Sequence, residues 1–318
     1  MAGIACAAMY SLAARAQAQE VRRLGVLMTY AADDAEASAR IHALESRLRQ
    51  LGWPPGSRLK IDYHLAGSAD PKVLQVHAAR LVAAAPDVIL AQSTPGLVAA
   101  RSVSGTRPLV FVQVTDPVGA GFVHSLAEPG GHITGFTDYE YDIGGKWIEL
   151  LKETVPTVSV IAVIAMAGHV GNAGIFHAME SVASRFAVRV LKVDISAHAQ
   201  AELATGTDVN GVIVLPSPAA VAHRDEIVAL SKRRRLPAVF PYGYFATDGG
   251  LMSYGIDQVD QWTQAASYVD RILRGEKPTN LPVQQPNKFE LIINAKTAKA
   301  LGIDLPPTLV ARADQVIE

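Results

Sequence analysis

The sequence predicts an α/β protein made of two doubly wound lobes in tandem, joined by a hinge that the chain crosses more than once. Short apolar runs, typical of buried strands, alternate with stretches whose apolar residues have helical spacing. This order predicts parallel sheets covered by helices on both faces. The pattern is completed once before residue 137 and starts again at Val158. The length of 318 residues suits two domains of ordinary size.

The first array begins with a buried strand at residues 24–28 and a helix at 33–51, which Gly52 ends. The last helix of the array opens at Thr94-Pro95, where Thr94 is expected to be the N-cap and Pro95 the first helical residue. The other elements expected here are strands at 59–65, 87–91 and 109–114 and a helix at 72–84.

The second array repeats the alternation after a connection, residues 131–145, that contains Gly135, Gly144 and Gly145 but no long flexible linker. Each array has the size of a small doubly wound domain. The elements expected in the second array are strands at 158–165, 189–195, 211–215 and 238–240 and helices at 172–186, 200–204 and 219–235.

The remaining residues are too few for a third domain. A glycine-rich turn at 249–255 leads to a helix at 258–274, a strand at 289–294 and a short helix that Gly302 ends. We expect this segment to cross back and add a strand and a helix to each lobe. The expected N-terminal lobe is residues 19–136 plus 253–283, and the expected C-terminal lobe is residues 137–252 plus 284–318.

The first 18 residues predict a cleaved signal peptide. Residues 2–14 are almost wholly small or apolar, and Ala16-Gln17-Ala18 matches an A-x-A cleavage site. No Lys or Arg precedes the apolar stretch, which suggests a start upstream of Met1; the alternative is a disordered or buried N-terminal helix. Cys6 is the only cysteine, so the mature chain would have no disulfide, as expected for the bacterial periplasm.

Composition and motifs argue against several other functions. The formal net charge of −1 does not favour nucleic acid or anionic lipid as a partner. The sequence has no GxxxxGK[ST], GxSxG or HExxH motif, and its nine histidines are scattered. The spacing of Gly168, Gly171 and Gly174 is GxxGxxG rather than the dinucleotide pattern GxGxxG. We therefore expect no cofactor, no metal and no enzymatic activity.

Three segments resemble a known family. They are residues 115–137 (TDPVGAGFVHSLAEPGGHITGFT), 249–257 (GGLMSYGID) and 268–318, which begins YVDRILRGEKP. They resemble the substrate-binding components of ABC transporters of the type that binds tryptophan and other aromatic amino acids. The resemblance implies a type I periplasmic-binding fold, in which two Rossmann-like lobes are joined by three crossings. It also implies delivery of a small-molecule ligand to a membrane permease and its ATPase.

Parallel α/β sheets bind ligands at the carboxyl ends of their strands. We therefore expect a cleft between the lobes, and a monomer, because the cleft must open and close. The candidate ligand-binding residues are Thr29, Tyr30, Gln92, Ser93, Thr94, Thr115, Asp116, Asp138, Tyr139, His169, Asn172, Ser217, Tyr242, Tyr254 and Asp257.

Some of these candidates suggest a chemistry. The strand-to-helix turn at Ser93-Thr94 favours a carboxylate, and Thr94 would also serve as a plain helix cap. Asp116 is a candidate acceptor for a ligand ammonium group, or a cap of the next turn. The four candidate tyrosines would line the binding site of an apolar or aromatic ligand, or simply pack in the core. His169 and Asn172 stand where family members often carry Asn-Pro-x-Asn-Pro, so we expect their contacts to be particular to this protein.

Two other functions remain open at this stage. The same two-lobed receptor would serve as a periplasmic sensor if it docked on a signalling protein, and neighbouring genes would distinguish that role. A periplasmic α/β enzyme would show turnover of its bound molecule.

Overall fold

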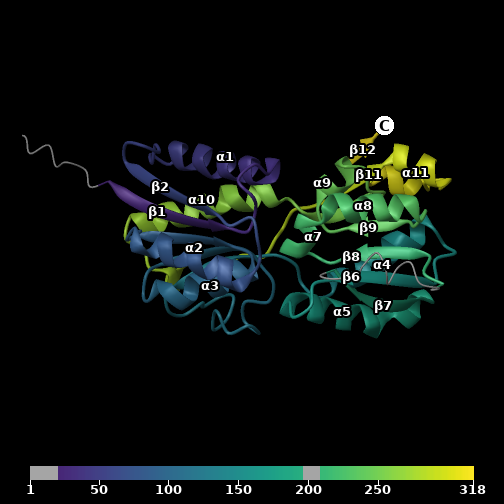
Figure 1. Ribbon diagram of the computed structural model, residues 1–318, viewed down its shortest axis with the longest axis horizontal. Helices are drawn as coiled ribbons and strands as arrows, with labels where there is room; N and C mark the ends of the chain where they lie inside the picture. Colours follow the sequence, from purple (N-terminus) through teal and green to yellow (C-terminus); the bar gives the residue numbers. More distant parts are fainter. Residues whose placement is uncertain (1–20, 196–207) are drawn as a thin grey trace, which may run out of the picture.

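The computed structural model describes residues 21–195 and 208–318, which form two α/β lobes lying side by side (Figure 1). The expected signal peptide and the expected helix at 200–204 lie outside the described residues. The strands are β1 Arg22–Met28, β2 Leu59–Leu65, β3 Val88–Gln92, β4 Leu109–Val114, β5 Ile133–Thr137, β6 Val160–Ala165, β7 Arg189–Asp194, β8 Gly211–Val214, β9 Ala238–Phe240, β10 Met252–Ile256, β11 Phe289–Asn294 and β12 Gln315–Ile317.

The helices cover the two sheets, and none of those in the described residues is both long and apolar enough to cross a membrane. They are α1 Ala35–Gln50, α2 Pro71–Ala83, α3 Thr94–Ser104, α4 Ile143–Thr154, α5 Val170–Ala183, α7 Pro218–Ala222, α8 Arg224–Arg233, α9 Gly243–Thr247, α10 Gln258–Leu273, α11 Ala295–Leu301 and α12 Pro307–Ala311. Two short 3-10 helices lie at Ser184–Phe186 and Pro278–Asn280.

The N-terminal lobe is a five-stranded sheet in the order β2-β1-β3-β4-β5, parallel throughout. Helices α1 and α10 pack together over one face, and α2 and α3 pack together over the other. The central strands β3 and β4 are buried along their whole length, which explains why their sequences are apolar except for Gln92 and Gln113. Asp34 and Asp70 cap α1 and α2 by accepting hydrogen bonds from backbone N–H groups of the first turn.

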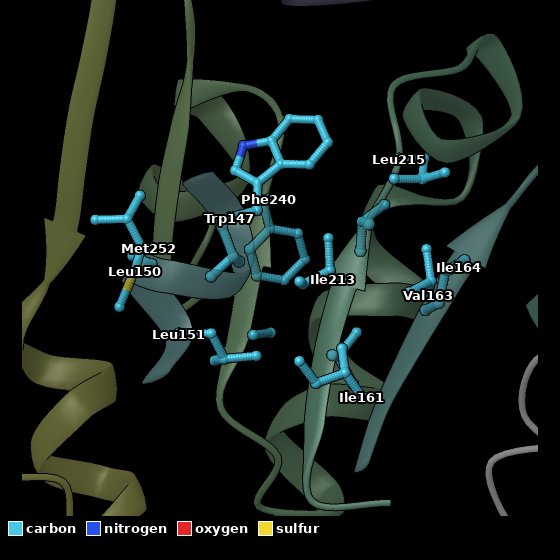
Figure 2. Packing of buried hydrophobic residues seen from close by; sticks show 14 of the residues in the cluster. Trp147, Leu150, Leu151, Ile161, Val163, Ile164, Ile213, Leu215, Phe240 and Met252 are labelled. Atoms are coloured by element: carbon cyan, nitrogen blue, oxygen red, sulfur yellow. The ribbon is translucent and has the colours of Figure 1, made fainter. Parts of the chain in front are cut away.

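The C-terminal lobe is a seven-stranded sheet in the order β12-β11-β10-β9-β8-β6-β7. Its strands pair in parallel except for β10 and β11, which are antiparallel. Figure 2 shows its core, where Trp147 and Leu151 of α4 gather with Ile213 of β8 and Phe240 of β9. The predicted class of two α/β lobes is therefore confirmed.

Three crossings connect the lobes. The first follows β5 and the second follows β10. The third runs from Gln284, which pairs with Phe136 in the N-terminal lobe, to β11 in the C-terminal lobe. The expected boundary at residue 253 is wrong, because β10 pairs with β9 and β11 in the C-terminal lobe and the chain crosses only after Ile256. The last segment also adds no full strand to the N-terminal lobe. It contributes α10 there and a single bridge at Gln284.

Two local expectations are corrected as well. Ser93 rather than Thr94 is the N-cap of α3, and its Oγ accepts from the Gly96 N–H at 3.4 Å. The helix expected at 219–235 breaks at His223, whose φ of −105° and ψ of 18° are not helical. The break falls one residue before Arg224, which reaches across to the other lobe.

Tyr139 lies on the first crossing and joins two parts of the C-terminal lobe. Its buried hydroxyl donates to the Pro241 carbonyl and accepts from the Ile256 N–H at 3.2 Å. This contact ties the end of β9 to the end of β10. The residue is part of the fold, with its ring inside the C-terminal core cluster.

Tyr139→Phe should lower the free energy of unfolding by about 1–3 kcal/mol, because it leaves a buried N–H and a buried carbonyl without a partner. Urea unfolding followed by circular dichroism measures the change. Tyr254→Phe is the matched control, because the Tyr254 ring stacks on Phe289 at 5.7 Å and keeps that contact. Equal stability of the two variants would contradict the role given to the Tyr139 hydroxyl.

Candidate functional site

A small cavity, here called the inner cavity, lies between the facing strand ends of the two lobes and has a volume of about 20 Å³. That is room for about one water molecule, so a larger ligand requires the lobes to move apart. The lining residues are Tyr30, Gln92, Ser93, Gln113, Thr115, Asp138, His169, Pro216, Ser217, Pro218, Val221 and Tyr242. They follow or end β1, β3, β4, β5, β6, β8 and β9.

Asp138 is the most unusual residue of the inner cavity. Its side chain is only 4% exposed, and Oδ2 accepts a hydrogen bond from the Tyr242 hydroxyl at 3.4 Å. Oδ1 is buried and has no hydrogen-bond partner among the described residues. Burial raises the pKa of Asp138 to about 7, an effect that the Tyr242 hydroxyl partly opposes. A buried acceptor of this kind suits a cationic ligand group.

The N-terminal wall of the inner cavity is built from strained backbone. Ser93 has φ 70° and ψ 160°, a region that is nearly exclusive to glycine. Gln113 has φ 59° and lies at a β-bulge, where the register of β4 against β5 shifts between Val112 and Val114. Strain of about 1–3 kcal/mol per residue persists only where the surrounding structure holds it, typically at binding sites.

The C-terminal wall comes from the starts of α5 and α7. Ser217 caps α7, its Oγ accepting from the Ala220 N–H at 3.1 Å. His169 caps α5, its Nδ1 accepting from the Asn172 N–H at 3.2 Å. Burial lowers the pKa of His169 to about 4, so its imidazole is neutral at physiological pH. Among the described residues, no group of three or more His, Cys, Asp or Glu side chains is placed to hold a metal ion.

A second space, here called the outer chamber, adjoins the inner cavity at His169 and has a volume of about 340 Å³. The N-terminal lobe contributes residues of α2 and α3, including Thr94, Pro95 and Val98, and the C-terminal lobe contributes residues 166–170. The lining is mainly apolar. Val98 and Val170 are both 53% exposed here, so the chamber has an apolar rim on each lobe.

Ten of the fifteen candidate ligand-binding residues line or adjoin the inner cavity and the outer chamber. Eight line the inner cavity: Tyr30, Gln92, Ser93, Thr115, Asp138, His169, Ser217 and Tyr242. Thr94 lines the outer chamber. Thr29 lies behind Gln92, and both its N–H and its Oγ1 donate to the Gln92 side chain.

The structure places five expected residues elsewhere or gives them other roles. Asp116 faces a separate pocket beside the hinge, where its carboxylate accepts from the Gly119 N–H at 2.8 Å and the Tyr141 hydroxyl at 2.6 Å. Tyr139 has the bridging contacts described above. Asn172 is fully buried and bonds the Met166 N–H and the Pro216 carbonyl. Tyr254 stacks on Phe289, and Asp257 caps α10 and pairs with Lys288.

Gln113 is the main residue that the sequence reasoning missed. It lies inside a strand whose other residues are apolar, LVFVQV, and the sequence gives no sign of the bulge that turns it toward the cavity. The only sign of Gln113 in the sequence is a polar residue in an otherwise apolar strand. Pro216, Pro218 and Val221 also line the cavity, and they are neighbours of the expected Ser217.

Two sets of contacts, here called the latch, join the lobes beside the inner cavity. Arg224 of α8 forms an ion pair with Asp34 of the N-terminal lobe, with Nη1 and Oδ2 3.0 Å apart. Arg40 of α1 is 1% exposed and lies 5.1 Å from the centre of the Tyr30 ring and 5.9 Å from that of Tyr244 in the C-terminal lobe. The latch therefore favours the closed arrangement.

The comparisons with known proteins agree with this geometry. A family model described as ABC transporter substrate binding protein matches residues 32–317. The chain belongs to this family of solute-binding proteins.

Individual relatives extend over nearly the whole chain. The chain is 27% identical over 295 residues to a tyrosine-binding protein of Clostridioides difficile strain R20291, covering 91% of this chain and 83% of that one. A conserved domain protein from Vibrio cholerae O1 biovar El Tor superimposes with a TM-score of 0.86 and 26% identity, covering 93% and 100% of the two chains. An ABC domain from Streptococcus pneumoniae, solved in complex with L-Trp, gives a TM-score of 0.86 at 22% identity, covering 94% and 100%. The fold is the type I periplasmic-binding fold.

The glycines at 168, 171 and 174 have a structural explanation. Gly168 has a φ of 72°, which favours glycine. A Cβ at Gly171 would lie 2.5 Å from the Cβ of Thr115 in the other lobe, and a Cβ at Gly174 would meet the Tyr141 ring. Gly171 therefore allows the start of α5 to approach the N-terminal lobe closely.

Gly171→Ala should hold the lobes apart and weaken ligand binding at least tenfold, because the clash involves the branched Cβ of a buried threonine rather than a flexible chain end. Small-angle X-ray scattering with and without ligand measures closure. Gly145→Ala is the control, because its Cβ would meet Val182 at an ordinary 3.7 Å. Full closure and unchanged affinity in Gly171→Ala would contradict this role.

Arg224→Gln should shift the unliganded protein toward the open form and raise the apparent Kd about two- to fivefold, since a partly exposed ion pair contributes about 0–1 kcal/mol. Titration calorimetry at low and high salt measures the change, and the difference from wild type should shrink at high salt. Arg189→Gln removes an ion pair with Asp208 within the C-terminal lobe and should have no effect on affinity. An equal effect of both substitutions would exclude the latch.

Proposed function

We propose that this chain is the extracytoplasmic solute-binding component of an ABC importer and that it binds a free amino acid between its lobes. The observation that supports the proposal most is the buried, unpartnered Asp138 Oδ1 at the meeting point of the two lobes. An α-ammonium group would satisfy it with a charge-assisted hydrogen bond.

The carboxylate of an amino acid would lie at the N-terminus of α3. Ser93 faces the inner cavity there, and the helix is 11 residues long, so its free N–H groups and dipole favour an anion. The two charged ends of the ligand would then be bound at the ends of β3 and β5, which belong to one sheet. Tyr242, His169 and Ser217 would complete the site from the other lobe.

The outer chamber supports an apolar or aromatic side chain. It adjoins the inner cavity, and its lining is mainly apolar. The names of the relatives are consistent with this class: one is a tyrosine-binding protein and one was solved with L-Trp. Because the inner cavity has room for about one water molecule, such a ligand would enter an open form and stabilise the closed one.

Delivery requires partners outside this chain. We propose an inner-membrane permease with its ATPase, export by cleavage of residues 1–18, and a monomeric protein in the periplasm. Family membership supports the first of these. Transport is tested by uptake of a radiolabelled amino acid in cells with and without the gene, whereas a sensor would leave uptake unchanged.

Binding is tested on the purified chain from residue 19 by thermal shift with each of the twenty amino acids, followed by calorimetry of those that stabilise it. Stabilisation by one or a few amino acids, with no chemical change in the recovered ligand, is the expected result. No stabilisation by any of them would overturn the amino-acid assignment.

Affinity should fall as pH is lowered from 8 to 5.5, by up to about tenfold per pH unit below 7. The pKa of Asp138 is raised to about 7, so acid protonates the free carboxyl, whereas a bound ammonium group requires the ionised form. The other cavity groups do not titrate in this range, because burial raises the pKa values of Tyr30 and Tyr242 and lowers that of His169 to about 4.

Calorimetry across this pH range measures the effect, with two buffers of different ionisation enthalpy to count released protons. Asp138→Asn should weaken binding about 10- to 100-fold at pH 8 by removing a charged hydrogen bond, and it should abolish the pH dependence. A wild-type affinity that stays constant with pH would remove Asp138 from the ammonium site.

A further inference from the structure

We infer that a hydrogen-bonded relay from Thr29 through Gln92 to Gln113 fixes Gln113 as a hydrogen-bond donor in the inner cavity, and that this donor selects ligands carrying a carboxylate. The inference rests on the proposed function and adds a second selective group to Asp138. It concerns which ligands the site accepts.

The relay begins at a backbone N–H group, which can only donate a hydrogen bond. The Thr29 N–H donates to Gln92 Oε1 at 3.0 Å, and the Thr29 hydroxyl donates to the same oxygen at 2.7 Å. A backbone N–H is only a donor, so the atom of the Gln92 amide that faces it must be the oxygen. This removes the usual ambiguity between the two ends of a glutamine amide.

The orientation of Gln92 then determines that of Gln113. With its oxygen committed, Gln92 presents Nε2 on the other side, where it donates to Gln113 Oε1 at 3.0 Å. Gln113 must therefore turn its own Nε2 away from Gln92. That nitrogen is buried and finds no partner in the part of the chain that the structure describes.

The position of Gln113 places this free donor at the site. Gln113 lines the inner cavity and is 5% exposed. The bulge and the positive φ of 59° at this residue keep its side chain from following the alternation of an ordinary strand. A strained backbone and a buried donor without a partner occur together, as expected for a group that awaits a ligand.

Among the described residues that line the inner cavity, Asp138 Oδ1 is a buried acceptor without a partner and Gln113 Nε2 is a buried donor without one. A molecule with an ammonium group and a carboxylate satisfies both. An amine without a carboxylate would leave the Gln113 donor buried and unpaired, which is costly. The relay therefore predicts strong discrimination between an amino acid and its decarboxylated amine.

The test compares L-tyrosine with tyramine and L-tryptophan with tryptamine by calorimetry. Wild type should bind the better of the two amino acids at least tenfold more tightly than its amine. Gln113→Met removes the donor at similar length. It should weaken binding of the amino acid about 5- to 20-fold but should not weaken binding of the amine, because the variant no longer buries an unpaired donor. Gln113→Glu should weaken binding of the amino acid at least 100-fold, because the new side-chain carboxylate would face the carboxylate of the ligand.

Gln92→Met tests the relay itself. Gln92 acts on the ligand through Gln113 as a positioning residue, so this neutral substitution should reduce the preference for the amino acid over the amine several-fold, mainly through weaker binding of the amino acid. In ¹⁵N-labelled wild type, the side-chain amide signals of Gln113 should shift on addition of the amino acid and not of the amine. Gln50→Glu, on the surface of the same lobe, controls for added negative charge, and thermal melting controls for folding.

The outcomes separate the two proposals. If wild type binds none of the twenty amino acids, the proposed function fails and the relay inference fails with it. If wild type binds L-tyrosine or L-tryptophan but both neutral variants keep the full preference for the amino acid, only the relay is overturned. The relay would also be overturned if Gln113→Met lost affinity for the amino acid and the amine equally, since that is the effect expected of Asp138→Asn.

Discussion

The burial of the Asp138 carboxyl between two facing sets of strand ends is the constraint on which the rest of the site depends. Its backbone N–H bonds to the Val114 carbonyl at 3.0 Å, which holds it against the N-terminal sheet, and its side chain meets Tyr242 of the other lobe. A buried carboxyl with one unsatisfied oxygen lowers the stability of the closed form. Such a group is useful where a ligand can supply the missing positive charge.

The other elements of the site are local departures from regular structure, anchored on rigid sheets. Ser93 and Gln113 have positive φ values at the ends of β3 and β4, and Gly171 permits the approach of α5. At Ser93 and Gln113 the unusual backbone lies at the end of a regular strand, which holds it in place. The sheets provide the stability that lets these few residues remain strained or unpaired.

The periodicity of the sequence predicted much of this arrangement. The bounds of β2, β4, β9 and β11 agree with it. Because parallel strands end at one edge, the residues that end or follow β1, β3, β4, β5, β6, β8 and β9 meet in the inner cavity. The predictions that were wrong or missing have local causes, which the spacing of apolar residues does not reveal. The bulge at Gln113 is unmarked in the sequence, the turn at Asp116 directs that carboxylate to the Gly119 N–H, and the antiparallel pairing of β10 with β11 keeps β10 in the C-terminal lobe.

The same two atoms that would select the ligand would also govern closure. The ion pair of the latch contributes little on its own, because Arg224 and Asp34 are partly exposed. Closing the lobes without a ligand buries Asp138 Oδ1 and Gln113 Nε2 unpaired, which opposes the latch. A ligand that satisfies both atoms removes this penalty only in the closed form, and that difference in affinity is what shifts the equilibrium. A molecule that satisfies one atom would leave part of the penalty in place, so poor recognition and incomplete closure would have the same cause.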